Sequence, residues 1–216
     1  KVPSTPDDPS RAILNGIADL AESESLGGID LTHGSTVATN SLLTRRGARA
    51  ALITTAGFED VIEIGRQSRN NLYDLAYHRP PPLIPRPLRF GIKERLDELG
   101  NVVEPISSRE IKRLTERIKK SGAEIAAVCF LHAYANSAHE EKVAEVLERA
   151  GIAVSLSSHV LPEYREYERT STTCVNAYVS PMMSRYLGEL ERKMGPGRLR
   201  IMQSNGGVIS SETASR

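Results

Sequence analysis

The chain has 216 residues, enough for one large domain or two small ones with a substantial core. Lys and Arg total 28 and Asp and Glu total 27, and this even balance argues against a protein that binds nucleic acid. The sequence contains no run of about 18 apolar residues, so it predicts no membrane span. Trp is absent and aromatic residues are only 5% of the chain, which weakens the case for a base-stacking surface.

The cysteines, the histidines and the first residues of the chain indicate no disulfide, metal site or signal peptide. Cys129 and Cys174 have no CxxC spacing, so we expect free thiols in a reducing compartment. His132 and His139 flank a predicted turn, but no Cys or carboxylate completes a tetrahedral set, and we expect no metal site. The chain begins without the apolar core of a signal peptide, which favours a cytoplasmic protein. It also begins with Lys1 rather than Met, and we expect a piece of a longer protein.

The first third of the chain alternates helical and strand patterns. Asp8 and Pro9 predict a helix start with Asp8 as the N-cap, and apolar residues at helical spacing continue to Ala21. Gly27 and Gly28 are expected to end this helix. The elements expected next are a strand at 29–32, an amphipathic segment at 36–43, a strand at 50–54 and a short helix around 61–64.

A proline-rich segment follows. Five prolines between Arg79 and Arg89 exclude a helix or a central strand, so we expect an extended connection on the surface. A β-hairpin is expected next, with strands at 90–96 and 102–106 joined by a turn at 97–100. These segments predict an insertion at 79–106 within a single domain that spans residues 1–216.

The rest of the chain continues the alternation. Ser107 and Glu110 have the spacing of a capping box before an amphipathic helix. The apolar run 124–131 is typical of a strand buried on both faces of a parallel sheet. The elements expected after it are a helix capped by Asn136 and Ser137, a strand at 153–156, a long helix from 163 to 194 with a possible break at Ser180 and Pro181, and a strand at 199–202. The order predicts an α/β protein with a mixed, mostly parallel, doubly wound sheet.

Two polar segments follow predicted strands, where open α/β sheets bind ligands. The first is THGSTVATN, residues 32–40, and the second is QSNGG, residues 203–207. Gly34 permits a tight turn, and the hydroxyls of Ser35 and Thr36 with the N–H groups of a helix start suit an anion or a carbonyl oxygen. The alternatives stay open that the first segment is only a helix N-cap and the second a plain turn.

Charged residues elsewhere have ordinary explanations. Arg66 offers a cation after a short helix, with a solvated side chain as the alternative. The segment 164–173 carries arginines and glutamates at helical spacing, which we interpret as ion pairs along a helix, among them Arg165, Glu166, Glu168 and Arg169. The sequence contains no Walker phosphate loop, and no Ser/His/Asp triad can be defended from spacing.

Taken together, these segments carry a resemblance. THGSTVATNSLLTRRGARAALITTAGFEDVIEIGRQSRNNLYDL resembles the amino-terminal region of the hydantoinase A / 5-oxoprolinase family, and the likeness continues through VCFLHAYANSAHE, LPEYREYERTSTTCVNAYVSP and IMQSNGG. Ser35 stands where the family usually has Thr, which keeps the hydroxyl. We expect the family's D-x-G-G-T-x-T-D phosphate loop before this chain and its later Gly-rich nucleotide segments after it.

The resemblance implies a fold of the actin-like, ribonuclease-H-like ATPase type and ATP-dependent hydrolysis of a cyclic amide. In that chemistry ATP phosphorylates the amide carbonyl oxygen, and the phosphate then leaves when water opens the ring. The implied cofactors are ATP and Mg²⁺, and the implied partners are a hydantoinase B-like subunit and further copies of the chain. The alternatives are a ketone carboxylase subunit, which would act through an enol phosphate, and an interaction domain without chemistry of its own. We expect the chain by itself to be inactive.

The resemblance also suggests which residues line the site. We expect His33 and Asn40 to be catalytic, with His33 donating a hydrogen bond or a proton. The residues expected to bind substrate or phosphate offer hydroxyl, amide, guanidinium or bare backbone groups, and they are Gly34, Ser35, Thr36, Thr39, Arg66, Gln203, Ser204, Asn205, Gly206 and Gly207.

Overall fold

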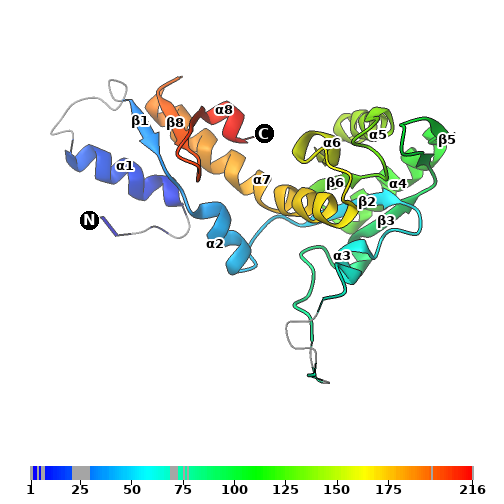
Figure 1. Ribbon diagram of the computed structural model, residues 1–216. Coiled ribbons are helices and arrows are strands. Elements are labelled where there is room, and N and C mark those ends of the chain that lie inside the picture. The colour runs from blue at the N-terminus through cyan, green and yellow to red at the C-terminus, as the bar shows by residue number, and fades with distance from the viewer. Residues whose placement is uncertain are drawn as a thin grey trace. The chain divides into compact units, whose positions relative to one another are not determined.

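A computed structural model describes residues 2–3, 5, 8–20, 30–68, 73–74, 76, 78–195 and 197–215. The chain divides into two compact units (Figure 1), Ala48–Tyr178, here called the central unit, and Lys1–Gly47 with Val179–Arg216, here called the terminal unit. The predicted helix stop at Gly27 and Gly28 lies outside the described residues.

The central unit is built on a four-stranded parallel sheet in the order β3-β2-β6-β7. Its strands are β2 (Ala50–Thr55), β3 (Arg89–Ile92), β6 (Ile125–Cys129) and β7 (Ala153–Leu156). β2 and β6 are buried along their whole length, which confirms the continuous apolar pattern as the mark of inner strands. β3, the next strand along the chain, lies on one side of β2, and β6 and β7 lie on the other side. The direction in which strands are added to the sheet therefore reverses between β2 and β6.

Both faces of this sheet are covered, as a doubly wound fold requires. One face packs against α4 (Ser108–Ser121) and α5 (Ala138–Arg149), through residues that include Ile111, Ile118, Val143 and Leu147. The other face packs against Cys174 and Ala177 of α7 (Glu166–Met194) and against Ile84 and Leu88. The remaining short elements here are α3 (Val61–Ile64), η2 (Arg86–Leu88) and α6 (Ser157–Val160).

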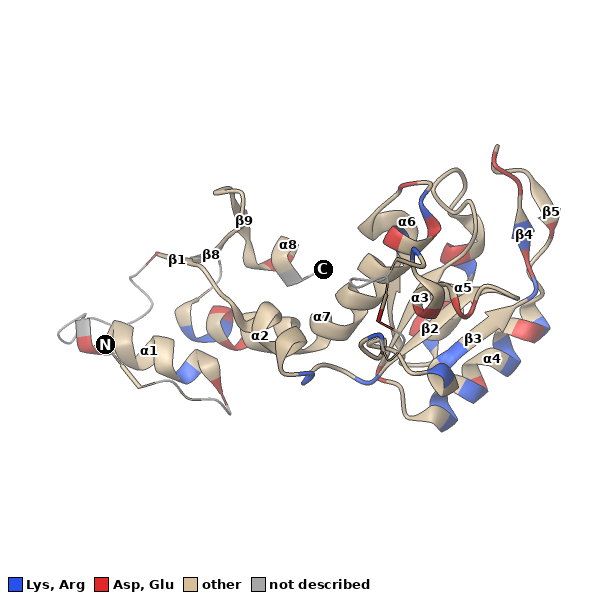
Figure 2. Ribbon diagram, turned by 60° about the horizontal axis from the view of Figure 1, so that its bottom comes forward, with Lys and Arg blue, Asp and Glu red and all other residues tan. Residues whose placement is uncertain are grey.

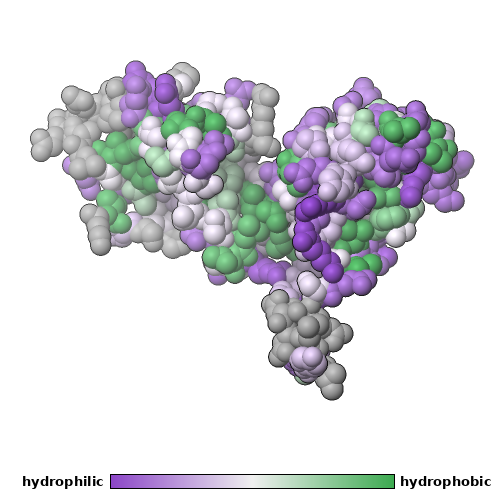
Figure 3. Space-filling model, in the orientation of Figure 1, coloured by the Kyte–Doolittle hydropathy of each residue, from purple (hydrophilic) through white to green (hydrophobic). Residues whose placement is uncertain are grey.

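The surface of the central unit is mixed in character. Lys and Arg gather along α4 (Figure 2), although the charges of the whole chain nearly cancel. Hydrophobic and hydrophilic residues alternate over the face seen in Figure 3, and the exposed apolar side chains of this unit include Leu99, Val102 and Val103. Among the described residues, no helix is long and apolar enough to cross a membrane.

The predicted hairpin is wrong over its first strand. Residues 89–92 pair in parallel with β2, with Ile53 opposite Phe90, and only β4 (Arg95–Leu96) and β5 (Val102–Glu104) pair with each other. The physical reason is burial, because Phe90 and Ile92 reach the core only as members of the main sheet. The proline segment also departs from a purely surface position, since Ile84 and Leu88 are buried.

The terminal unit contains a three-stranded sheet in the order β1-β8-β9. β1 (Leu31–His33) lies parallel to β8 (Leu199–Met202), which is antiparallel to β9 (Val208–Ser210). The core of this unit combines apolar residues of these strands with residues of α1 (Pro9–Leu20) and of α7, chiefly Leu14, Tyr186, Leu187, Leu190 and Met194. Two more helices, α2 (Val37–Leu43) and α8 (Ser211–Ser215), follow β1 and β9.

The long helix α7 is continuous over 29 residues and keeps Pro181 inside it, so the expected break is absent. A proline removes one backbone hydrogen bond, and buried side chains on both sides of Pro181 offset that loss. The division between the units falls within α7, between Tyr178 and Val179. Next to it, the Ala48 N–H donates to the Tyr178 carbonyl at 2.8 Å.

The predicted helix caps have mixed outcomes. The Asp8 cap is confirmed, because its Oδ1 accepts from the Ser10 N–H at 3.0 Å. The capping box is wrong in detail, since Ser107 makes no side-chain cap bond. At α5, Asn136 Oδ1 accepts from the Ala138 N–H at 3.0 Å. Cys129 and Cys174 are free and buried, as expected for the thiols, and burial raises the pKa of both.

Candidate functional site

The parallel pairing of β1 with β8 brings the two predicted site segments to one edge of a sheet. His33, the last residue of β1, lies opposite Ile201, the residue before the end of β8. Because parallel strands run in the same direction, the segment from Gly34 and the segment from Gln203 leave the sheet at the same end. We call residues 34–40 and 203–207 the β1/β8 edge.

His33 is held by a residue that the sequence did not indicate. Its Nε2 lies 2.6 Å from the hydroxyl of Tyr186 on α7, and the two rings meet edge to face with centroids 5.9 Å apart. Burial lowers the pKa of His33 below its ordinary 6.5, so the imidazole is neutral at pH 7. Burial also raises the pKa of Tyr186, while a hydrogen bond from the Ser35 side chain acts in the opposite direction.

The start of α2 uses some of its polar groups and exposes others. Ser35 Oγ accepts from the Val37 N–H at 3.2 Å, so this hydroxyl does act as a local cap. The N-cap Thr36 makes no such bond, and its hydroxyl accepts from Asn40 Nδ2 at 3.4 Å. Thr36, Thr39 and Asn40 are exposed, so they can meet a ligand.

The second segment is the turn between β8 and β9. The Gly206 N–H donates to the Gln203 carbonyl at 3.0 Å, and Asn205 Oδ1 accepts from the Gly207 N–H at 2.8 Å. Gly206 has φ 85°, a conformation that a glycine adopts without strain. The plain-turn interpretation is therefore right for the backbone, while the side chains of Gln203, Ser204 and Asn205 are exposed.

Arg66 belongs to the central unit, whereas the other predicted site residues belong to the terminal unit. Its guanidinium forms an ion pair with Glu168. It lines a cavity of about 530 Å³ together with Arg79, Tyr167 and Cys174. Arg79 in turn donates to the backbone carbonyls of Glu63, Ile64 and Ser68 and so fixes the turn that carries Arg66.

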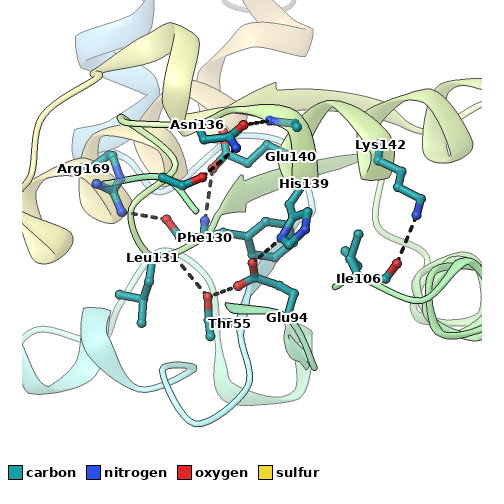
Figure 4. A network of polar contacts seen from close by, with 12 residues as sticks. Thr55, Glu94, Ile106, Phe130, Leu131, Asn136, His139, Glu140, Lys142 and Arg169 are labelled. Atoms are coloured by element: carbon teal, nitrogen blue, oxygen red, sulfur yellow. Dashed lines mark hydrogen bonds and ion pairs between the residues drawn. The ribbon is translucent and has the colours of Figure 1, made fainter. Parts of the chain in front are cut away.

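A buried polar network occupies the carboxyl ends of β2 and β6, where the strand order reverses (Figure 4). The fully buried carboxylate of Glu94 accepts a hydrogen bond from Thr55 and lies 2.8 Å from His139 Nδ1. Thr55 Oγ1 also accepts from the Leu131 N–H at 3.1 Å, so the network ties the ends of β2 and β6 together. Sequence patterns missed it because its members lie far apart in the chain.

The same network corrects the interpretation of residues 164–173. Arg169 is buried and donates to the carbonyls of Phe130 at 2.7 Å and Glu163 at 2.6 Å, rather than to a glutamate of its own helix. Glu168 pairs with Arg66 instead. Buried cations need such fixed partners, and the carbonyl left at the end of β6 supplies one.

Comparison with known proteins adds a family context. A sequence family described as the hydantoinase/oxoprolinase N-terminal region matches residues 1–151, and one described as hydantoinase/oxoprolinase matches residues 169–216. An uncharacterised protein of Methanocaldococcus jannaschii is 41% identical over 99% of this chain and 33% of its own length. The caprolactamase α subunit of Pseudomonas jessenii is 34% identical over 96% of this chain and 32% of its own length, and 5-oxoprolinase 1 of Arabidopsis thaliana is 32% identical over 81% and 16%.

Two solved structures are similar over nearly the whole chain. The ATP-dependent caprolactamase of Pseudomonas jessenii has a TM-score of 0.85 at 34% identity over 98% of this chain and 33% of that one. Nucleotide-free acetone carboxylase, described with ATP-dependent acetone carboxylation, has a TM-score of 0.80 at 26% identity over 98% and 34%. The chain thus spans about a third of the length of the Methanocaldococcus protein, of caprolactamase and of acetone carboxylase.

Proposed function

The chain belongs to the hydantoinase/oxoprolinase family, and from that premise we propose that it is the amino-terminal part of an ATP-dependent hydrolase of cyclic amides. Caprolactamase and 5-oxoprolinase are the relatives that favour this reaction class. The substrate is a small lactam or hydantoin whose carbonyl must be activated before water can attack it. The location proposed for the whole protein is the cytoplasm.

The observation that carries the proposal is the meeting of two polar segments at the β1/β8 edge. Exposed hydroxyl and amide groups of Thr36, Asn40 and Asn205 lie on these segments. Such groups hydrogen-bond carbonyl and phosphate oxygens, and a strand end in an α/β fold is where ligands of this kind bind. Arg66 is proposed as a second anion-binding group, on the central unit.

In the proposed reaction, the γ-phosphoryl group of ATP passes to the amide carbonyl oxygen and ADP leaves. Water then adds to the activated carbon, and the ring C–N bond breaks to leave the freed amine and an acyl phosphate. A second water hydrolyses this acyl phosphate, which releases the carboxylate and inorganic phosphate. The β1/β8 edge would orient the carbonyl and the phosphoryl oxygens, which is the main catalytic contribution a protein makes to phosphoryl transfer.

The fit to the two proposed cofactors differs. The donors of the β1/β8 edge fit phosphate oxygens. Mg²⁺ at such sites is held by one or two carboxylates together with phosphate oxygens and water, and the β1/β8 edge carries no carboxylate side chain. The residues of this edge therefore do not fit the metal.

A second candidate is a subunit of an ATP-dependent ketone carboxylase, which the similarity to acetone carboxylase favours. An interaction domain without chemistry of its own remains the third. Partner subunits are also proposed, a hydantoinase B-like one and further copies of the chain, since relatives are named as an α subunit and a γ subunit.

The test uses the full-length protein that contains this chain, with the variants His33→Ala and Asn205→Ala. We expect phosphate release from ATP to depend on an added lactam or hydantoin, and we expect each variant to lower it about 100-fold, the scale for a positioned catalytic donor. His159→Ala is the matched control, because His159 is exposed on α6 in the central unit.

Three outcomes separate the candidates. Amide-dependent turnover that both variants abolish supports the proposal. Turnover that requires a ketone and bicarbonate instead would establish the carboxylase. Near-normal turnover in both variants would show that the β1/β8 edge does not take part in the reaction.

A further inference from the structure

We propose that Tyr186 is a positioning residue that fixes His33 as the neutral tautomer with its proton on Nδ1, so that His33 acts as a hydrogen-bond donor through Nδ1 and not as a proton donor. The inference rests on the proposed function for its catalytic meaning, while its structural content stands alone. It decides between the two roles that the sequence leaves open for His33.

The contact is short and enclosed. The Tyr186 hydroxyl lies 2.6 Å from His33 Nε2, within the range of a strong O–H···N hydrogen bond. Tyr186 is 6% exposed and belongs to the apolar core of the terminal unit. Its ring meets the imidazole edge to face at an interplanar angle of 66°, which fixes the orientation of both rings.

The direction of the bond follows from acid–base chemistry. A phenol, with an ordinary pKa near 10, is a much better donor than the N–H of a neutral imidazole, and an imidazole nitrogen is the better acceptor. Tyr186 therefore donates to Nε2, which cannot carry a proton of its own. In a neutral ring the proton must then be on Nδ1.

Ser35 lies beside this pair at the start of α2. Its hydroxyl oxygen accepts from the Val37 N–H at 3.2 Å, and its side chain lowers the pKa of Tyr186 against the larger effect of burial. The pair of His33 and Tyr186 is therefore next to the start of α2.

The consequence for chemistry is specific. A general acid at Nε2 would have to displace the Tyr186 proton, and an imidazolium would oppose the burial that already lowers the pKa of His33. The neutral ring can still donate from Nδ1 to a carbonyl or phosphoryl oxygen. Activity should then decline only when the pH falls far enough to protonate His33.

The first test reads the tautomer directly. The full-length protein is labelled with ¹⁵N-histidine, its long-range ¹H–¹⁵N spectrum is recorded at pH 7.5, and the His33 signals are identified by their loss in His33→Asn. We expect the Nδ1–H form. The Nε2–H form, or a rapid mixture, would overturn the proposal even if the protein shows no amide-dependent turnover, and even if no Tyr186 variant folds.

The second test compares Tyr186→Phe with Tyr178→Phe, the same substitution at another buried position of α7. For Tyr186→Phe we expect kcat to fall about tenfold with KM within about twofold, because one orienting hydrogen bond is lost. Without the phenol proton, the acid limb of the kcat profile should also move to higher pH. Tyr178→Phe should leave kcat and KM within about twofold of the wild type and should not move the acid limb of the kcat profile.

A purely structural role for Tyr186 would lower the amount of folded enzyme without moving the pH profile. An unchanged kcat and profile in Tyr186→Phe would therefore overturn the proposal. Absence of amide-dependent turnover in the wild type would refute the proposed function alone, since the tautomer measurement then decides the role of Tyr186.

Discussion

Glu140 lies on α5 next to His139 of the buried polar network (Figure 4), and its carboxylate satisfies three donors at once. Oε1 accepts from the Phe130 N–H at 3.0 Å and from Ser157 Oγ at 2.6 Å, and Oε2 accepts from the Ser158 N–H at 2.9 Å. Glu140 is fully buried, so no water replaces these bonds. The perturbation is Glu140→Gln, which keeps the shape of the side chain and removes its charge.

Each of the three hydrogen bonds contributes to the destabilisation expected for Glu140→Gln. A glutamine oxygen at the Oε1 position keeps two bonds, but each falls from a charged to a neutral one, a loss of about 1 kcal/mol. The new NH₂ group then faces the Ser158 N–H, and the loss of that charged bond costs about 1.5–3 kcal/mol. We expect a total of about 3–5 kcal/mol, a large fraction of the stability of a domain.

The assay is amide hydrogen exchange by mass spectrometry on peptides that contain Phe130 and Ser158. Since about 1.4 kcal/mol is a factor of ten in an equilibrium constant, protection there should fall by at least about 100-fold. Glu141→Gln is the control, because the neighbouring Glu141 is exposed and its carboxylate accepts from the Ser137 hydroxyl. A fall of less than tenfold in Glu140→Gln, or an equal fall in the control, would show that the Glu140 charge does not hold these two amides.

Two further predictions concern packing and pH. Gly91→Ala should destabilise the protein by about 1–3 kcal/mol in urea unfolding, since its Cβ would lie 2.9 Å from the Ala56 Cα and would also clash with the Glu59 carboxylate. Gly188→Ala, with open space at that Cβ on α7, should instead stabilise by about 0.5–1 kcal/mol, and a loss there would contradict the argument. His33 has a lowered pKa, so the unfolded state binds its proton more tightly. His33 therefore contributes stability that is present above about pH 6.5 and is lost as the pH falls toward its folded pKa. When the free energy of unfolding is measured from pH 8 to pH 5, that of His33→Asn should fall less steeply than that of the wild type. Equal slopes would contradict this role of His33.

Much of the fold could be predicted because its strongest signals are local. The run at 124–131 and the segment at 50–54 are apolar along their length, and both became inner strands of a parallel sheet. Periodicity could not place residues 89–92, because alternation does not say which strand is the partner. Burial of Phe90 against the main sheet decided that question. Pro181 shows the same limit, since tertiary packing kept the helix intact around it.

Of the candidate site, the two polar segments at strand ends could be found from the sequence, and the residues that hold them could not. The sequence placed Gly34 and Gln203 just after strands, and the parallel pairing of those strands brings both segments to one edge. Tyr186 could not be found, because one tyrosine on an apolar helical stripe has the pattern of an ordinary core residue. Glu94 and His139 were missed for a related reason. Residues of these types usually lie on the surface, so the sequence alone did not indicate that these two are buried together.

The hydrogen bond between Ala48 and Tyr178 bears on the order in which the molecule assembles. The central unit is one uninterrupted stretch of chain, so it can fold while the residues that follow it are still being synthesised. The sheet of the terminal unit must wait, because β1 pairs with β8, which follows the central unit in the sequence. A folded central unit holds its own two ends together, and this shortens the loop that must close before β1 and β8 can pair. We therefore expect the β1/β8 edge to form after the central unit.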